Sequence, residues 1–249
     1  MIALTAPYQV TWEKLPDDFV LDDDPVDNIN QPALAAALTE SLNLARKLPP
    51  NALTSTNYGI CATVNGQIVV KAPDWAYVPA IQVPREEVER SYTPNLQGDV
   101  PVVVMEFISN TDGTEYSTKP TYPPGKWFFY EQILRVPNYI IFDPATAVLE
   151  AYRLQPSGHY QLQPLDTNNR FFVFEMNLSV GVWQGNRENR TGPWLRWWDE
   201  TGNLLLWGTE QAEQERQRAE QERQRAEQER QRAERLAAQL RAAGINPEG

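Results

Sequence analysis

Apolar residues at helical spacing predict one amphipathic helix early in the chain, over residues 32–47. The repeat consists of Leu34, Leu38, Leu42 and Ala45. Pro32 suits the first turn of a helix, and two prolines at 49–50 end the segment. We therefore expect a helix that buries one face.

The segments that follow are rich in β-branched and aromatic residues, which predicts strands. Residues 58–64 and 67–71 flank the dipeptide Asn65-Gly66, the strongest short signal for a tight hairpin. We expect residues 72–79, with the sequence APDWAYVP, to continue the same sheet.

The middle of the chain alternates between strand-like and helix-like segments. Residues 101–109, PVVVMEFIS, form a non-alternating apolar run that is typical of a central, doubly covered strand. A loop rich in Gly, Thr and Pro follows over 109–125, then an aromatic helix over 126–136 and a second buried strand over 138–144. This order predicts an α/β fold, a mixed sheet flanked by helices, with short strands over 147–207 as a β-rich extension.

The C-terminal segment has a different composition, because the heptad EQERQRA recurs from Glu213 to Ala233. A coiled coil needs apolar residues at both a and d, and here one small apolar position occurs per heptad. Glu-to-Arg spacings of three favour a solvated helix with side-chain ion pairs instead. We therefore predict two parts: residues 1–208, which include an acidic N-terminal entry, and a charged helix over 209–249. Whether this helix associates with a second copy stays open.

Composition narrows the class of protein. The chain has 249 residues, 41% of them apolar, and a net charge of −11, which argues against non-specific nucleic-acid binding. Much of the acid is concentrated between residues 13 and 27, so a cleft elsewhere can still be positive. The single cysteine, Cys61, excludes an intramolecular disulfide and a cysteine-based zinc site. We see no membrane-spanning run and no signal peptide, and the cytoplasm is the expected compartment.

Glu106 is the most informative residue, because it closes an apolar strand where a carboxylate is costly to bury without a partner or a metal. Asp74 ends another apolar stretch, and Lys126 opens the aromatic helix. Two carboxylates and the main-chain carbonyl of Phe107 would offer Mg²⁺ or Mn²⁺ the hard oxygens that it prefers. A lysine beside them could orient or deprotonate water, or balance negative charge. Asp74, Glu106 and Lys126 together indicate a phosphodiester-cleaving metal site.

Each of these residues also has a simpler interpretation. A Pro-Asp pair usually marks a turn, and Lys126 could be a solvated lysine. The single histidine, His159, lies in a turn-like segment, and Cys61 suits a small buried position. Four tryptophans crowd the end of the β-rich extension, where packing of a small sheet is favoured over stacking of bases: Trp194, Trp197, Trp198 and Trp207.

Four motifs in this order resemble the Uma-two restriction-endonuclease family, a branch of the PD-(D/E)XK nuclease superfamily. They are Pro73-Asp74, Glu106 with Ser109, Lys126 with Tyr130, and Asp143-Pro144. The resemblance covers roughly residues 10 to 200. It implies a restriction-endonuclease-like fold, with Asp74 and Glu106 as metal ligands and a catalytic lysine that has moved from the strand to the helix.

The chain departs from the family pattern at several positions. Ile108 stands where the superfamily usually has its lysine, and the loop before Lys126 holds a rival, Lys119. Members of the family often have a histidine near the start of the first helix, where this chain has Gln31-Pro32. Glu40 could add a further acidic ligand, although a solvated helix face is the stronger interpretation of this residue.

The resemblance implies a Mg²⁺-dependent or Mn²⁺-dependent endonuclease whose partner is nucleic acid, with DNA the expected substrate. The alternative is a catalytically silent protein that uses the nuclease fold as a scaffold and its helical tail for assembly, with a homodimer as one outcome. No membrane partner is expected.

Overall fold

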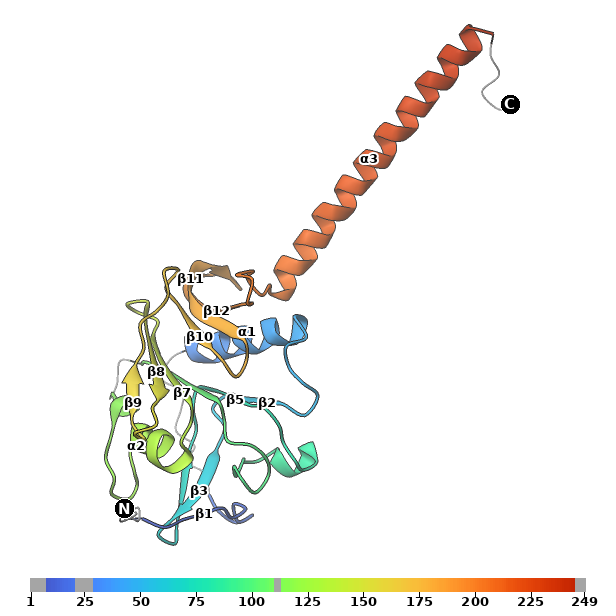
Figure 1. Cartoon of the computed structure of the whole chain (residues 1–249). Helices are drawn as coiled ribbons and strands as arrows, with labels where there is room; N and C mark the ends of the chain where they lie inside the picture. Colours follow the sequence, from blue (N-terminus) through green and yellow to red (C-terminus); the bar gives the residue numbers. More distant parts are fainter. Residues whose placement is uncertain (1–7, 21–28, 110–112, 245–249) are drawn as a thin grey trace. The chain divides into compact units, whose positions relative to one another are not determined.

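A computed structural model describes residues 8–20, 29–109 and 113–244 of the chain. The chain divides into two compact units, Met1–Leu205 and Leu206–Gly249. The first unit contains all the strands, and the second contains one long helix (Figure 1).

A six-stranded mixed sheet organises the first unit (Figure 1). Its order is β2-β5-β6-β7-β8-β9, and β6 and β7 form its one parallel pair among the described residues. The predicted central strand is therefore confirmed as β6, between β5 and β7. The strands are β2 (Leu53–Ser55), β5 (Trp75–Val78), β6 (Val103–Phe107), β7 (Asn138–Asp143), β8 (Val148–Leu154) and β9 (Tyr160–Leu162).

The predicted hairpin forms, but it belongs to a different sheet. β3 (Ile60–Val64) and β4 (Gln67–Lys71) pair across Asn65 and Gly66, whose φ angles of 50° and 76° suit a tight hairpin turn. A short strand, β1 (Val10–Thr11), pairs with β3 and completes a three-stranded sheet. The prediction that 72–79 continues the hairpin's sheet is wrong, because β5 pairs with β2 and β6 instead.

The β-rich extension forms a third sheet from β10 (Arg170–Val173), β11 (Leu178–Arg187) and β12 (Arg190–Trp198). Its tryptophans pack, as predicted: Trp194 and Trp197 are fully buried, and the Trp197 ring lies 5.7 Å from that of Trp75 in the central sheet. Because buried rings cannot stack on bases, these two provide no nucleic-acid platform.

Helices cover the two faces of the six-stranded sheet. α1 (Asn30–Leu44) contacts β12, and its Thr39 hydroxyl accepts a hydrogen bond from the Trp75 indole at 2.9 Å. On the opposite face, α2 (Lys126–Phe128) continues into a π-helical turn, η3 (Phe129–Leu134). This turn packs in one core with β3 and β4: Ile60, Ala62, Val69, Ala76, Val104, Phe129, Tyr130, Ile133, Leu134, Val136, Tyr139 and Ile141.

Two short 3₁₀ turns complete the unit, η1 (Arg85–Val88) and η2 (Thr114–Tyr116). Much of the predicted acidic entry lies outside the described residues, which omit 1–7 and 21–28.

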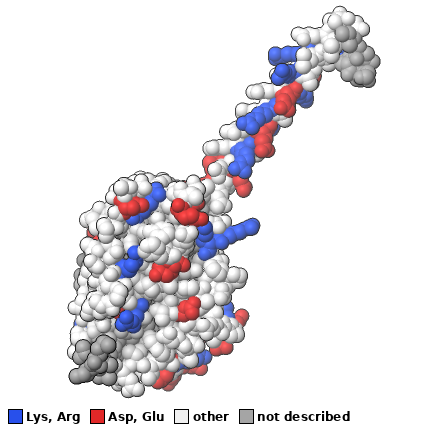
Figure 2. Space-filling view, viewed as in Figure 1, with Lys and Arg blue, Asp and Glu red and all other residues white. Residues whose placement is uncertain are grey.

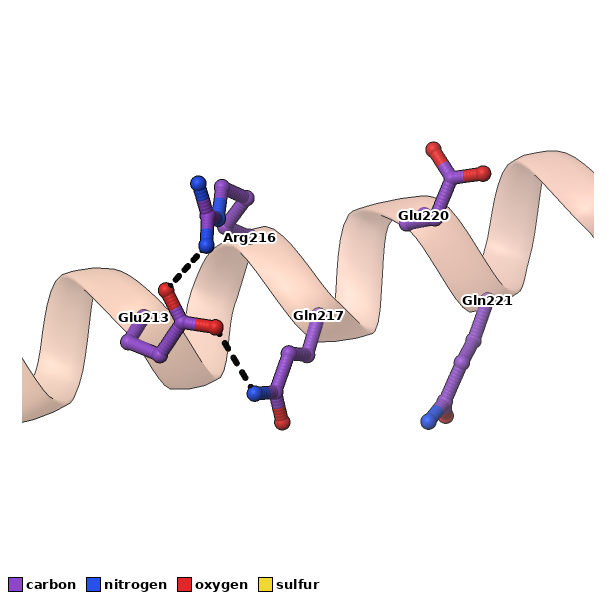
Figure 3. Close-up of a pocket in the computed structure, with 5 residues that line it drawn as sticks. All are labelled: Glu213, Arg216, Gln217, Glu220 and Gln221. Carbon is purple, nitrogen blue, oxygen red and sulfur yellow. Dashed lines mark hydrogen bonds and ion pairs between the residues drawn. The ribbon is translucent and has the colours of Figure 1, made fainter.

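The second unit is α3 (Gly208–Ala242), which has no buried residue. Acidic and basic side chains alternate along it (Figure 2). Glu213 accepts hydrogen bonds from Arg216 at 2.6 Å and Gln217 at 2.8 Å, and the hollow in Figure 3 is lined by this one helix. The pattern repeats at Glu220 and Glu227. The glutamates of three successive heptads thus pair with an arginine three residues on and a glutamine four residues on in the same helix, and the spacing of three between Glu and Arg is the one that the sequence predicts.

We expect a chain truncated after Gly208 to unfold within about 2 °C of the full chain, because exposed pairs within a helix contribute only about 0.3 kcal/mol each. Thermal unfolding followed at 280 nm does not report on α3, which has no tryptophan or tyrosine. A markedly lower midpoint for the shortened chain would contradict this expectation.

Candidate active site

The register of β5 and β6 brings Asp74 and Glu106 together. Trp75 pairs with Met105 at the end of the ladder, so the next positions, Asp74 and Glu106, lie opposite each other. Cross-strand neighbours have their Cβ atoms about 5 Å apart on the same face of the sheet. Each carboxyl group influences the pKa of the other.

Glu106 is fully buried and both of its oxygens have partners. Lys126 Nζ donates to Oε2 at 2.9 Å, and the Tyr130 hydroxyl donates to Oε1 at 2.9 Å. Both partners come from the helical turn that packs on this face of the sheet, so core packing aims them at the carboxylate. Lys126 keeps 24% of its side chain exposed and is the member of the group that reaches solvent.

Asp74 is held by the main chain of the neighbouring strand. The Phe107 N–H donates to its Oδ2 at 2.6 Å, and the residue is 8% exposed. The position is therefore a buried, oriented carboxylate and not the solvent-facing turn of the simpler interpretation.

Burial dominates the electrostatics of both acids. It raises the pKa of Asp74 to about 6, although the Phe107 N–H and Lys126 favour the charged form. It also raises the pKa of Glu106 to about 7, against the opposing effect of Lys126. Burial alone would lower the pKa of Lys126, but Glu106 and Asp74 outweigh it and raise that pKa. The Lys126 ammonium therefore stays protonated. Asp74 and Glu106 are the two groups that gain or lose protons near neutral pH.

The main-chain carbonyl of Phe107 has a partner that the sequence analysis did not predict. The Gln31 side-chain amide donates to this oxygen at 2.7 Å, and Gln31 is 7% exposed. A carbonyl oxygen has two lone pairs, so one acceptor position remains.

The donor set fits a magnesium-like cation by its chemistry. Two carboxylates and one main-chain carbonyl are hard oxygen ligands, and Mg²⁺ commonly binds through one or two carboxylates with water in its other positions. Within residues 8–20, 29–109 and 113–244, no three His, Cys, Asp or Glu side chains are placed to hold a metal together. Asp74, Glu106 and the Phe107 carbonyl would therefore hold it without a third acidic side chain.

The other residues that the sequence analysis considered for this site make different contacts: Lys119, Glu40 and Asp143. Lys119 is exposed, and in the described part of the chain it forms no ion pair with either carboxylate. Glu40 pairs with Arg187 at 2.6 Å, which links α1 to β11. Asp143 accepts hydrogen bonds from Ala145 and Thr146 in the turn after β7. Glu40 and Asp143 therefore have partners other than Asp74, Glu106 and Lys126.

Cys61 is buried and His159 has a side chain 71% exposed, as their simpler interpretations predict. Glu115 is a further buried carboxylate, in η2, whose charge raises the pKa of both Asp74 and Lys126. Its loop position carries no periodic signal, which is why the sequence did not reveal it. Tyr130, by contrast, could be found from its spacing of four residues from Lys126.

Among the residues with described placement, no helix combines the length and the apolarity that a membrane crossing needs. A family model described as "Uma2: Putative restriction endonuclease" matches residues 23–185 of the chain. This match agrees with the mixed sheet and its flanking helices, and the predicted restriction-endonuclease-like fold is confirmed. No curated protein matches the chain.

The raised pKa of Asp74 predicts how stability depends on pH. Between its ordinary value near 3.8 and about 6, the folded protein binds more protons than the unfolded chain, so stability falls as pH rises through this window. Without divalent cations, we expect Asp74→Asn to raise the unfolding free energy by about 2 kcal/mol at pH 8 and to change it little at pH 4. Urea unfolding at both pH values measures the difference.

Asp143→Asn serves as the control. Hydrogen bonding, first from Thr146, lowers the pKa of Asp143, so its charge favours folding and its removal should not stabilise the protein at pH 8. Equal stabilities of wild type and Asp74→Asn at pH 8 would show that the Asp74 charge is not costly.

Proposed function

Because the chain belongs to the Uma2 family, whose description indicates a nuclease, we propose that it is a divalent-metal-dependent endonuclease that hydrolyses phosphodiester bonds of DNA. One observation carries the proposal: Asp74 and Glu106 face each other where β5 begins and β6 ends, with the Lys126 ammonium 2.9 Å from Glu106. Buried carboxylates without a cation are costly, and a bound cation would favour their charged forms.

Each residue has a distinct part in the proposed reaction. A divalent cation would supply Lewis acidity and would lower the pKa of water at the site. The carboxylates of Asp74 and Glu106 would hold it, and Tyr130 keeps the Glu106 carboxylate in one orientation through its 2.9 Å hydrogen bond. The raised pKa of Lys126 favours a protonated ammonium, which suits it to balance charge on the phosphate and not to take a proton from water.

DNA is the proposed substrate because the family is described as restriction endonucleases. The net charge of −11 opposes long-range attraction of a polyanion, and the body face in Figure 2 shows acidic and basic side chains interspersed. Cleavage of plasmid DNA and of RNA transcripts in Mg²⁺, Mn²⁺ and EDTA tests both the metal and the substrate.

A catalytically silent scaffold is the competing function, and the fully satisfied, buried Glu106 is the observation that favours it. Calorimetric titration of Mg²⁺ separates the two. The nuclease should bind the ion in the millimolar range or tighter and lose binding in Glu106→Gln, whereas a silent scaffold should show no binding in either protein.

We expect Asp74→Asn and Glu106→Gln each to reduce Mg²⁺-dependent cleavage to the level seen in EDTA, because each removes a charged ligand while keeping side-chain shape. Circular dichroism should show an intact fold. The Asp143→Asn protein, altered at another strand end, should cleave normally. Unimpaired cleavage by either site variant would refute the assignment of that carboxylate.

Lys126→Met should slow single-turnover cleavage at saturating Mg²⁺ by about 10² or more, since it removes a positioned cation but no metal ligand. Lys119→Met is the matched control, because Lys119 is exposed in the loop before the same helix. We expect it to change mainly the apparent affinity for substrate. The reverse ranking would assign the catalytic ammonium to the loop.

A further inference from the structure

Gln31 lies at a point where the sheet leaves a main-chain peptide without a strand partner. The β5–β6 ladder stops at the pair Trp75 and Met105, two residues before β6 ends at Phe107. On the other side of β6, the Ile108 N–H donates to the Phe142 carbonyl of β7. Alternate residues of a strand direct their N–H and C=O groups to opposite neighbouring strands. The N–H and the C=O of Phe107 therefore both face the β5 side of β6, where the ladder has already stopped.

Two side chains take the place of the missing strand. Asp74 accepts from the Phe107 N–H at 2.6 Å, and the Gln31 amide donates to the Phe107 carbonyl at 2.7 Å. A buried main-chain group without a partner costs free energy, so both contacts favour the folded state. One of them is made by a proposed metal ligand and the other by a residue with no assigned role.

The first turn of α1 that carries Gln31 is fixed by contacts other than a helix cap. Ile29 at the N-cap position provides no side-chain hydrogen bond. Instead, Arg190 at the tip of the β11–β12 hairpin donates to the Asn30 side chain and lies over the Trp194 ring at 3.9 Å. Gln31 therefore projects from a helix turn that is tied to the β11–β12 hairpin, which favours a single orientation of its amide.

We propose that Gln31 is a positioning residue of the active site, whose amide holds the Phe107 carbonyl oxygen in the direction from which it ligates the catalytic cation. The inference rests on the proposed function. One lone pair of the carbonyl accepts from Gln31, and the other would be available to a cation held by Asp74 and Glu106. Partners of this kind typically change metal affinity by about 10-fold to 100-fold when they are removed.

The test compares Gln31→Met, which keeps the length of the side chain but has no donor, with Ser41→Ala. Ser41 is a buried polar residue of the same helix whose hydroxyl donates, among the described residues, to the Ala37 and Leu38 carbonyls of that helix. Mg²⁺ affinity is measured by calorimetry, and Mn²⁺ affinity by the loss of its free-ion paramagnetic resonance signal. Single-turnover cleavage is then followed as a function of Mg²⁺ concentration.

We expect Gln31→Met to weaken both ions about tenfold or more and to regain most of its cleavage rate when Mg²⁺ is raised by the same factor. Ser41→Ala should bind both ions as the wild type does. Wild-type affinity in Gln31→Met, tighter binding, or an equal loss in both variants would overturn the positioning role. A lower melting temperature with unchanged affinity would do the same, by showing that the contact serves the fold alone.

The two proposals fail in different ways. If the wild type binds neither ion, the metal-dependent function fails and the role of Gln31 fails with it. If the wild type binds and Asp74→Asn abolishes binding while Gln31→Met does not change it, the proposed function survives and only the inference about Gln31 is refuted.

Discussion

The burial of one carboxylate, that of Glu106, is the constraint on which the rest of this site depends. A charge inside a six-stranded sheet is costly unless hydrogen bonds and an opposite charge surround it. Lys126 and Tyr130 meet that requirement, and both come from a helical turn whose other side chains form the core of that face. The same core packing therefore stabilises the fold and directs the Lys126 ammonium toward Glu106.

A second constraint follows from unequal strand lengths. β5 ends before β6 does, so the last peptide of β6 must find partners outside a ladder. Asp74 and Gln31 supply them from a strand end and a helix start. The candidate site lies at this position because Asp74 and Gln31, which hydrogen-bond the unpaired Phe107 peptide, are held next to Glu106.

The two units differ in whether their charged side chains are buried or exposed. In the first unit a few buried charges are strongly coupled, and burial raises the pKa values of Asp74 and Glu106 to about 6 and 7. In α3 the charges are exposed and paired at short range along one helix. Such pairs stabilise a helix in water but leave no apolar seam for a coiled coil. The buried, coupled carboxylates therefore lie in the first unit, whereas the side chains of α3 are not buried.

Local signals in the sequence were sufficient wherever the cause is local. Asn65-Gly66 predicts its hairpin because few residues tolerate two positive φ angles in succession, and the heptads predict α3 because their ion pairs span three residues. Glu106 stood out because a carboxylate at the end of an apolar strand requires an explanation. Lys126 was singled out because it opens the aromatic helix, and Tyr130 because it lies four residues, about one helical turn, further along.

Tertiary structure decided everything that depends on partners distant in the chain. Hairpin periodicity cannot tell which sheet a strand joins, so the separation of β3 and β4 from β5 appeared only in the fold. Gln31 reaches Phe107 across 76 positions, and the loop residue Glu115 acts on Asp74 through space. The facing of Asp74 and Glu106 depends on strand register, which is set by the packing of whole faces and is not encoded in any short segment.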